Sequence, residues 1–152
     1  MVVHELTPAQ CRDVLAHTNL ARLACARADQ PYIVPLFFHY HADDDALYSF
    51  STLGQKIDWM RGNPKVCLEI DEIGNQFNWK TVVVIGRYEE IGDGPEDADA
   101  RRRVRDLLDK VPAWWLPGAA KLTGSDEHHV PVLFRIRVSS LSGRQSSRPV
   151  GT

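Results

Sequence analysis

The stretch YSFSTLGQKIDWMRGNPKV, residues 48–66, combines side chains that could bind an anion. Two hydroxyls, a glycine and a cation precede or begin a short helical segment: Ser51, Thr52, Gly54 and Lys56. A phosphate needs several hydrogen-bond donors that converge on it and a backbone that can approach closely. Turns made of Ser, Thr and Gly are also common as plain connections. The residues alone therefore leave two interpretations open, a phosphate site and a structural turn.

The histidines are the other side chains that could bind a ligand directly. His39 and His41 are spaced i and i+2 on a predicted strand, so both point to one face and could form half of a metal site. Only the aspartates at 43–45 are near them in sequence. His128 and His129 are adjacent, so an extended segment would direct them to opposite faces. No third ligand stands at a suitable spacing, and we predict no metal site.

Trp114 and Trp115 lie side by side in the proline-bounded loop PAWWLP. Each indole offers a large apolar surface with one polar N–H group. Such a pair in a loop suits a cover over a ligand, or a contact with a second subunit, better than a core. We therefore expect both in the substrate pocket. Cys67 has no adjoining cation that would lower its pKa, and no known catalytic pattern appears, so no catalytic residue is predicted.

The composition is typical of one globular domain. The chain has 152 residues, of which 43% are apolar and 25% charged. A net charge of -2 gives no general attraction to nucleic acid or to an anionic membrane. No apolar run reaches the ~20 residues that cross a bilayer, and the N-terminus lacks a secretory pattern. The 3 scattered cysteines indicate reduced thiols. We expect a cytoplasmic single domain, residues 1–152, that binds neither nucleic acid nor membranes.

Six stretches show the aromatic, β-branched or alternating patterns of strands. They are residues 21–27, 32–41, 47–50, 65–71, 79–91 and 132–138. Pro35 cannot donate to a strand ladder, so its strand needs an edge position or a bulge there. Because the strands follow one another closely with few helices between them, the sequence predicts a mainly β, mostly antiparallel barrel with appended helices.

Helices are predicted at two places besides the short segment after Gly54. Thr7-Pro8-Ala9-Gln10 is a capping-box pattern that opens a helix to about His17. Residues 97–111 carry apolar side chains at helical spacing and oppositely charged pairs four residues apart. The residues from Gly143 onward, GRQSSRPVGT, are predicted to form a flexible tail, 143–152.

The strand segment Thr81–Ile85, TVVVI, is apolar on both of its faces. A small antiparallel barrel usually leaves one face of each strand in water. Either the appended helices or a second subunit must then cover the outer face. With only one long helix predicted, we expect a homodimer with twofold symmetry.

The order of these motifs resembles the FMN-binding split-barrel proteins related to pyridoxamine 5'-phosphate oxidase, in particular the nitroimidazole-resistance-type flavoproteins. The resemblance covers about residues 20–143. It rests on ARLACA, QPYIVPLFFHYH, LYSFSTLGQKIDWMRGNPKVCLEID, WKTVVVIGRYEEI and VPVLFRIRVSSLSGR. The run GxK…RxNPxV, followed by a strand with VVxGR, is its most specific part. The resemblance implies a six-stranded antiparallel split β-barrel that forms a homodimer, with the cofactor at the interface.

The resemblance also implies which residues bind FMN. The phosphate would lie on Lys56 and the hydroxyls beside it, which favours the anion-binding interpretation of that turn. The backbone of residues 34–37 would follow the edge of the isoalloxazine ring, and Thr81 would also reach the flavin. The complete set is Val34, Pro35, Leu36, Phe37, Ser51, Thr52, Gln55, Lys56 and Thr81.

The chain departs from two activities within this group. True pyridoxamine 5'-phosphate oxidases have arginine and histidine on a C-terminal strand, which GRQSSRPVGT lacks, and an arginine where this chain has Gln55. The nitroimidazole-resistance proteins have a histidine where this chain has Ser49 or Phe50. We expect an FMN-dependent oxidoreductase that passes hydride or electrons to a small, flat, electron-poor acceptor, and not a true pyridoxamine 5'-phosphate oxidase.

Alternatives to this function stay open. A reductase on the same fold could use the deazaflavin F420, since a phosphate site does not distinguish the two cofactors. A non-catalytic protein could bind flavin or haem for storage, sensing or partner regulation. In the haem case the ligands would come from His39, His41, His128 and His129. A dimeric structural module with an empty cleft is the remaining alternative.

Overall fold

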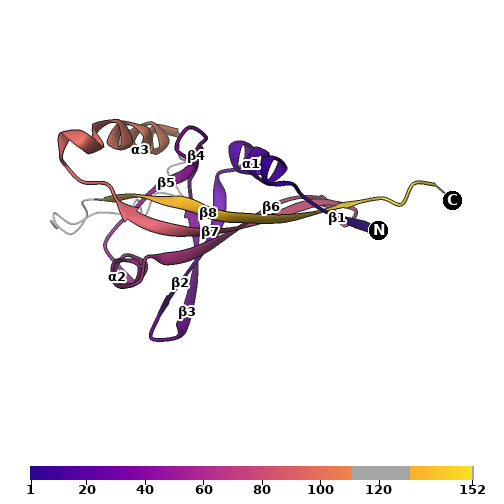
Figure 1. Cartoon of the computed structure of the whole chain (residues 1–152), viewed down its shortest axis with the longest axis horizontal. Helices are drawn as coiled ribbons and strands as arrows, with labels where there is room; N and C mark the ends of the chain where they lie inside the picture. Colours follow the sequence, from indigo (N-terminus) through magenta and orange to yellow (C-terminus); the bar gives the residue numbers. More distant parts are fainter. Residues whose placement is uncertain (111–130, 152) are drawn as a thin grey trace.

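The computed structural model describes residues 1–110 and 131–151, which form one antiparallel sheet with three α-helices (Figure 1). The strands are β1 Val2–Glu5, β2 Leu20–Arg27, β3 Gln30–Phe37, β4 His39–His41, β5 Ala46–Ser51, β6 Lys65–Asn75, β7 Asn78–Glu90 and β8 Val132–Ser147. The helices are α1 Pro8–His17, α2 Gln55–Gly62 and α3 Ala98–Lys110, with a short 3-10 helix η1 at Pro95–Asp97. The predicted mainly β, antiparallel fold with appended helices is confirmed.

The strands pair in the order β3-β2-β6-β7-β8-β5-β4, and β1 pairs with β8. The strand β8 holds the sheet together, because its first half pairs with β5 and its last residues pair with β1. Figure 1 shows β8 running the length of the molecule, with α3 near one end and β1 at the other. Residues that pair with opposite ends of β8 are therefore far apart in one chain.

Helix α1 begins with the capping box that the sequence predicts. The Thr7 hydroxyl accepts a hydrogen bond from the Gln10 backbone N–H at 3.2 Å, and the Gln10 side chain accepts one from the Thr7 N–H at 2.9 Å. Helix α3 packs against β5 through Ala100, Val104 and Leu107, as its apolar spacing predicts. A separate main core fills the space between the strands, α1 and α2: among its members are Leu15, Leu23, Phe38, Met60, Leu68, Val84 and Ile136.

The glycine of the VVxGR motif has a structural role. The pairing of β7 with β8 shifts register between Ile85 and Gly86. A Cβ atom at Gly86 would lie 2.6 Å from the Arg137 carbonyl oxygen and 2.6 Å from Ile136 Cγ2. Only glycine allows the backbone of β8 to come this close.

The described residues contain eight strands where six were predicted. The predicted strand at 32–41 is divided at Phe38 into β3 and β4, which lie at opposite edges of the sheet. The additional strand β1 pairs with the end of β8, at Ser147 to Arg144. Neither feature has a local signal in the sequence, because both depend on which strands become neighbours.

The prediction of a flexible tail at 143–152 was wrong for residues 143–147, which belong to β8. Gly143 pairs with Val82 of β7, and its carbonyl oxygen accepts a hydrogen bond from Leu6 N–H at 2.9 Å. A Cβ at Gly143 would lie 2.8 Å from Leu6 Cδ1 and 2.9 Å from the Cys11 sulfur. Gly143, which was predicted to begin the tail, is thus a β8 residue whose missing side chain allows close packing against Leu6 and Cys11.

Strand β3 is an edge strand, as Pro35 predicted. On β7, Val82 and Val84 are buried, whereas Val83 is 37% and Ile85 48% exposed. Within the described ranges the helices do not cover this outer face. Among the same residues, no helix combines the length and the apolar character that crossing a membrane requires.

Candidate functional site

The predicted phosphate corner lies where β5 leads into α2. All six residues of β5 are buried, and the strand pairs with β4 on one side and β8 on the other. Helix α2 begins at Gln55 with Gly54 as its N-cap, and no side chain among the described residues caps its first N–H groups. Uncapped N–H groups at a helix start favour an anion. Ser51, Thr52, Gln55 and Lys56 are thereby placed around one corner of the sheet.

Lys56 is the residue that gives this corner its charge. Its ammonium group is partly buried and makes no hydrogen bond or ion pair with any described residue. Burial lowers the pKa of Lys56. The nearby Cys25 thiol does not act as a counter-ion, because burial raises its own pKa and keeps it protonated. A partly buried cation without a partner is unfavourable, and an anionic ligand would relieve it.

The hydroxyls beside Lys56 differ in availability. Ser51 is 1% exposed and donates its proton to the Thr52 carbonyl oxygen at 3.0 Å. It must rotate to donate to a ligand. The side chains of Thr52 and Gln55 have no hydrogen-bond partner among the described residues, so they are free to bind one. The corner therefore offers Thr52, Gln55 and Lys56 directly, and Ser51 after a rotation.

The predicted ring-binding segment, residues 34–37, is brought beside this corner. It forms the end of edge strand β3, and the outer side of residues 34–36 pairs with no other strand that the structure describes. The Ser49 hydroxyl donates to the Phe37 carbonyl oxygen at 2.5 Å, which fixes the end of β3 against β5. Leu36 is buried and Pro35 is exposed. A ligand at the corner can therefore reach the open edge of this segment.

Thr81 is not brought to the corner. Ser51 pairs with Val132 at the start of β8, whereas Thr81 pairs with Arg144 near its end. Twelve residues of strand, roughly 40 Å at ~3.3 Å per residue, separate the two positions along β8. The Thr81 hydroxyl donates to Glu69 at 3.0 Å and borders a separate groove of about 360 Å³. Thr81 can meet a ligand at the corner only if it belongs to a second copy of the chain.

Trp114, Trp115, His128 and His129 lie outside the described residues. His41 Nδ1 lies 2.8 Å from Asp44 Oδ1, so that ring is already engaged. No group of three or more metal-binding side chains occurs among the residues that the structure describes.

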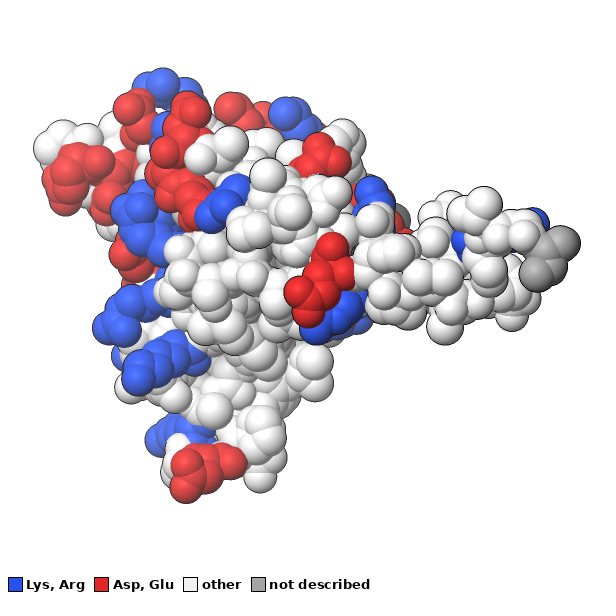
Figure 2. Space-filling model, turned by 45° about the vertical axis from the view of Figure 1, so that its right-hand side comes forward, with Lys and Arg blue, Asp and Glu red and all other residues white. Residues whose placement is uncertain are grey.

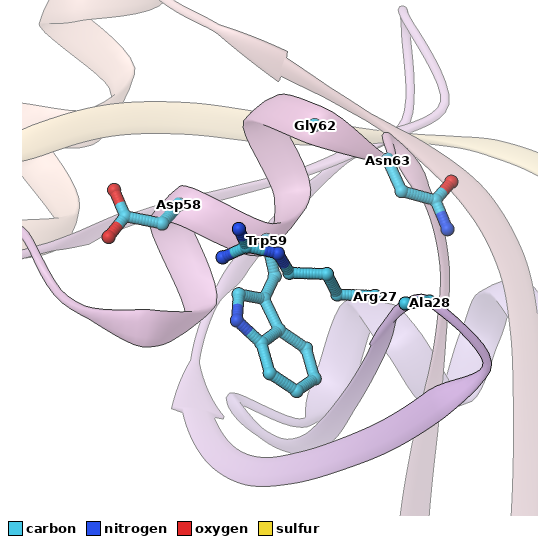
Figure 3. A pocket seen from close by; sticks show the side chains of 6 residues that line it. All are labelled: Arg27, Ala28, Asp58, Trp59, Gly62 and Asn63. Atoms are coloured by element: carbon cyan, nitrogen blue, oxygen red, sulfur yellow. The ribbon is translucent and has the colours of Figure 1, made fainter.

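The sequence did not reveal a pocket between α2 and the β2–β3 turn. It has a volume of about 520 Å³ and is lined by Arg27, Ala28, Asp58, Trp59, Gly62 and Asn63 (Figure 3). The available signal was the spacing of Lys56 and Trp59, three residues apart on one helix face. That spacing alone does not indicate a pocket, because the other wall comes from the β2–β3 turn.

The charges on the surface are mixed in sign. Figure 2 shows one face of the molecule, where acidic and basic side chains lie mostly along one side and the middle carries few of either. This distribution agrees with the net charge of -2.

Comparison with known proteins identifies the family. The model of the family described as pyridoxamine 5'-phosphate oxidase matches residues 7–145. The chain belongs to this family. An uncharacterized protein of Rhizobium meliloti is 42% identical over 149 residues, which cover 95% of each chain. The resemblance read from the motifs is therefore confirmed.

Solved structures share the fold. A protein of Mesorhizobium loti described as FAD-binding is 40% identical, with a TM-score of 0.83 over 97% of this chain and 99% of its own. A candidate 5-nitroimidazole antibiotic resistance protein of Bacteroides thetaiotaomicron is 15% identical, with a TM-score of 0.64 over 95% of this chain and 89% of its own. The second likeness shows the common fold and no more.

Proposed function

We propose that this chain is a flavoprotein that binds the phosphate of a flavin nucleotide at the α2 corner. The observation that carries the proposal is the Lys56 ammonium, which is partly buried and has no partner among the described residues. Uncapped N–H groups of α2, together with Thr52 and Gln55, complete a set of donors suited to phosphate. The relative that is 40% identical and described as FAD-binding supports a flavin as the ligand.

The flavin ring would lie along residues 34–37 of β3. The open edge of this strand offers backbone N–H and C=O groups, which suit the polar edge of an isoalloxazine ring. Pro35 contributes only a carbonyl oxygen there. When bound, the flavin supplies the redox chemistry, and the protein supplies position and electrostatics. The expected reaction is transfer of hydride or electrons to a small, flat, electron-poor acceptor.

The ligand identity is tested by denaturing the purified full chain and analysing the released small molecule by mass spectrometry. Titrations of FMN, FAD and F420, followed by tryptophan fluorescence, would then compare affinities. We expect Lys56→Gln to weaken flavin binding by about tenfold or more, because a charge-assisted hydrogen bond is lost. Lys110→Gln, at an exposed lysine on α3, is the matched control and should leave affinity unchanged. A wild-type chain that binds no flavin would contradict the proposal.

The second part of the proposal is a homodimer that covers the outer face of the sheet. The strand register places Ile33, Ala24, Cys67 and Ile85 in one row, with exposed fractions of 63% for Ile33 and 48% for Ile85. A twofold partner on this face would bury these side chains and would bring its Thr81 toward the corner of the first copy. We expect analytical ultracentrifugation to give twice the mass of the chain, and Ile85→Glu to give the monomer.

A further inference from the structure

Two side chains of α2 and its C-cap residue form a stripe that faces the β2–β3 hairpin. Lys56 and Trp59 are spaced i and i+3 on one side of the helix, and Asn63 follows the last helical residue, Gly62. The Trp59 indole packs on the Tyr32 ring at 5.5 Å between centroids and 56° between planes. The Asn63 amide donates to the Ala26 carbonyl oxygen at 3.2 Å. The stripe thus leads from the proposed phosphate corner to the end of β2.

The pocket of about 520 Å³ lies at the far end of this stripe. Its volume is in the range of small-ligand sites, roughly 300–1,000 Å³. Figure 3 shows the Arg27 side chain extending from the end of β2 toward Trp59. Arg27 is exposed and has no hydrogen-bond or ion-pair partner among the described residues. An indole and a free guanidinium are the groups on which a nucleobase stacks and to which a phosphate binds.

The turn that forms the pocket wall has an unusual backbone. Ala28 and Asp29 both have positive φ, 48° and 64°, in the two-residue connection between β2 and β3. Non-glycine residues seldom adopt this conformation, and it persists where the surrounding structure enforces it. The tight turn keeps Arg27 and Ala28 next to α2.

We infer that this pocket binds the adenosine half of FAD. The inference rests on the proposed function, because it takes the flavin phosphate to lie at Lys56. From Lys56 to Gly62 the helix rises about 9 Å at 1.5 Å per residue, so a second phosphate and an adenosine can extend along α2. Arg27 would contact the second phosphate, and Trp59 would stack on the adenine. FMN, which ends at its single phosphate, would leave the pocket unused.

The test measures dissociation constants for FAD and FMN with the full chain after its flavin has been removed. We expect the wild type to bind FAD at least about tenfold more tightly than FMN. Trp59→Ala should weaken FAD binding about tenfold or more, Arg27→Gln about threefold to tenfold, and neither should change FMN binding. Trp59→Phe, which keeps an aromatic face, should retain most of the affinity for FAD. Arg102→Gln, at an exposed arginine of α3, is the control for Arg27→Gln.

The outcomes separate the two proposals. Equal affinity of the wild type for FAD and FMN, with no effect of Arg27→Gln, would overturn the adenosine site and leave the flavoprotein proposal intact. Equal losses of FAD and FMN in both Trp59→Ala and Arg27→Gln would also overturn it, because neither side chain would then act specifically on the adenosine half. Failure of the wild type to bind either flavin would overturn both proposals. Arg27 is exposed, so its variant remains informative where Trp59→Ala does not fold.

Discussion

Arg12 and Asp45 form a two-point ion pair that joins α1 to the turn before β5. Arg12 Nε lies 3.1 Å from Asp45 Oδ1, and Nη2 lies 2.9 Å from Oδ2. The Tyr40 hydroxyl donates to the same carboxylate at 2.6 Å. Asp45 also has a positive φ of 50°, which asparagine tolerates as well as aspartate. The pair is therefore open to a substitution that removes charge and leaves the turn unchanged.

We expect Asp45→Asn to lower the free energy of unfolding by about 1 kcal/mol. The ion pair is partly exposed, so its contribution to the free energy of unfolding should lie between that of a surface pair and that of a buried pair. Urea denaturation measures the change. Asp43→Asn, in the same turn and exposed, serves as the control and should be neutral within about 0.5 kcal/mol. An unaltered midpoint for Asp45→Asn would show that the pair adds nothing.

The same carboxylate predicts a dependence of stability on acid. The hydrogen bond from Arg12 lowers the pKa of Asp45 in the folded chain and outweighs the opposing effect of burial. The unfolded chain then binds more protons in acid, so the contribution is complete above the unfolded pKa, near ~4, and is lost as pH falls through the folded pKa. Unfolding free energies measured between pH 6 and pH 3 should fall less steeply for Asp45→Asn than for the wild type. Parallel curves would contradict this.

Lys56→Met should raise the stability of the flavin-free chain while weakening flavin binding. Burial lowers the pKa of Lys56, so the folded state disfavours its charge when no anion is present. Replacing the ammonium by an apolar side chain should add about 0.5–1 kcal/mol to the unfolding free energy. Urea denaturation with and without flavin would show opposite effects of the substitution. A loss of stability in both conditions would mean that Lys56 has a structural role.

Gly86→Ala should lower the unfolding free energy by about 2 kcal/mol or more. The added Cβ would lie 2.6 Å from the Arg137 carbonyl oxygen, and backbone cannot move aside as a flexible side chain can. Gly62→Ala is the matched control, since a Cβ there meets nothing within 4 Å. Thermal denaturation of both variants would give the comparison. Equal midpoints would show that β8 shifts without cost.

Ala28→Gly should stabilise the chain by about 0.5 kcal/mol, because glycine adopts positive φ without the penalty that alanine has there. Ala26→Gly, two residues earlier within β2, should have the opposite sign, since an extended strand gains nothing from glycine. Chemical denaturation of the two variants checks both signs. A shared loss of stability would show that the turn is not strained.

The local features of the fold could be predicted from sequence, because their causes are local. The capping box of Thr7 and Gln10 and the apolar spacing of α3 each specify one element without reference to the rest of the chain. Contacts between distant segments could not be predicted in this way. Gly143 resembles the start of a tail until the close approach of Leu6 and Cys11 is known.

In the candidate site, too, neighbours in sequence could be predicted and contacts between distant segments could not. Lys56 and the hydroxyls near it were recognisable as a group because they are neighbours in sequence. The pocket at Arg27 and Trp59 could not be predicted from the sequence, because its two walls meet only when the β2–β3 turn lies against α2. The resemblance implied that Thr81 binds the flavin. The strand register places Thr81 far from Ser51 within one chain.

Pro35 also bears on whether the edges of two sheets can pair with each other. It removes one amide donor from the exposed rim of the sheet, and a regular strand from a neighbouring molecule would find that hydrogen bond missing. The rim is thereby poor at templating fibrils or extended sheets, yet its remaining carbonyls and amides stay accessible to compounds too small to need a continuous ladder. One proline can thus leave the edge of β3 accessible to a small ligand while it disfavours pairing with a strand of another molecule.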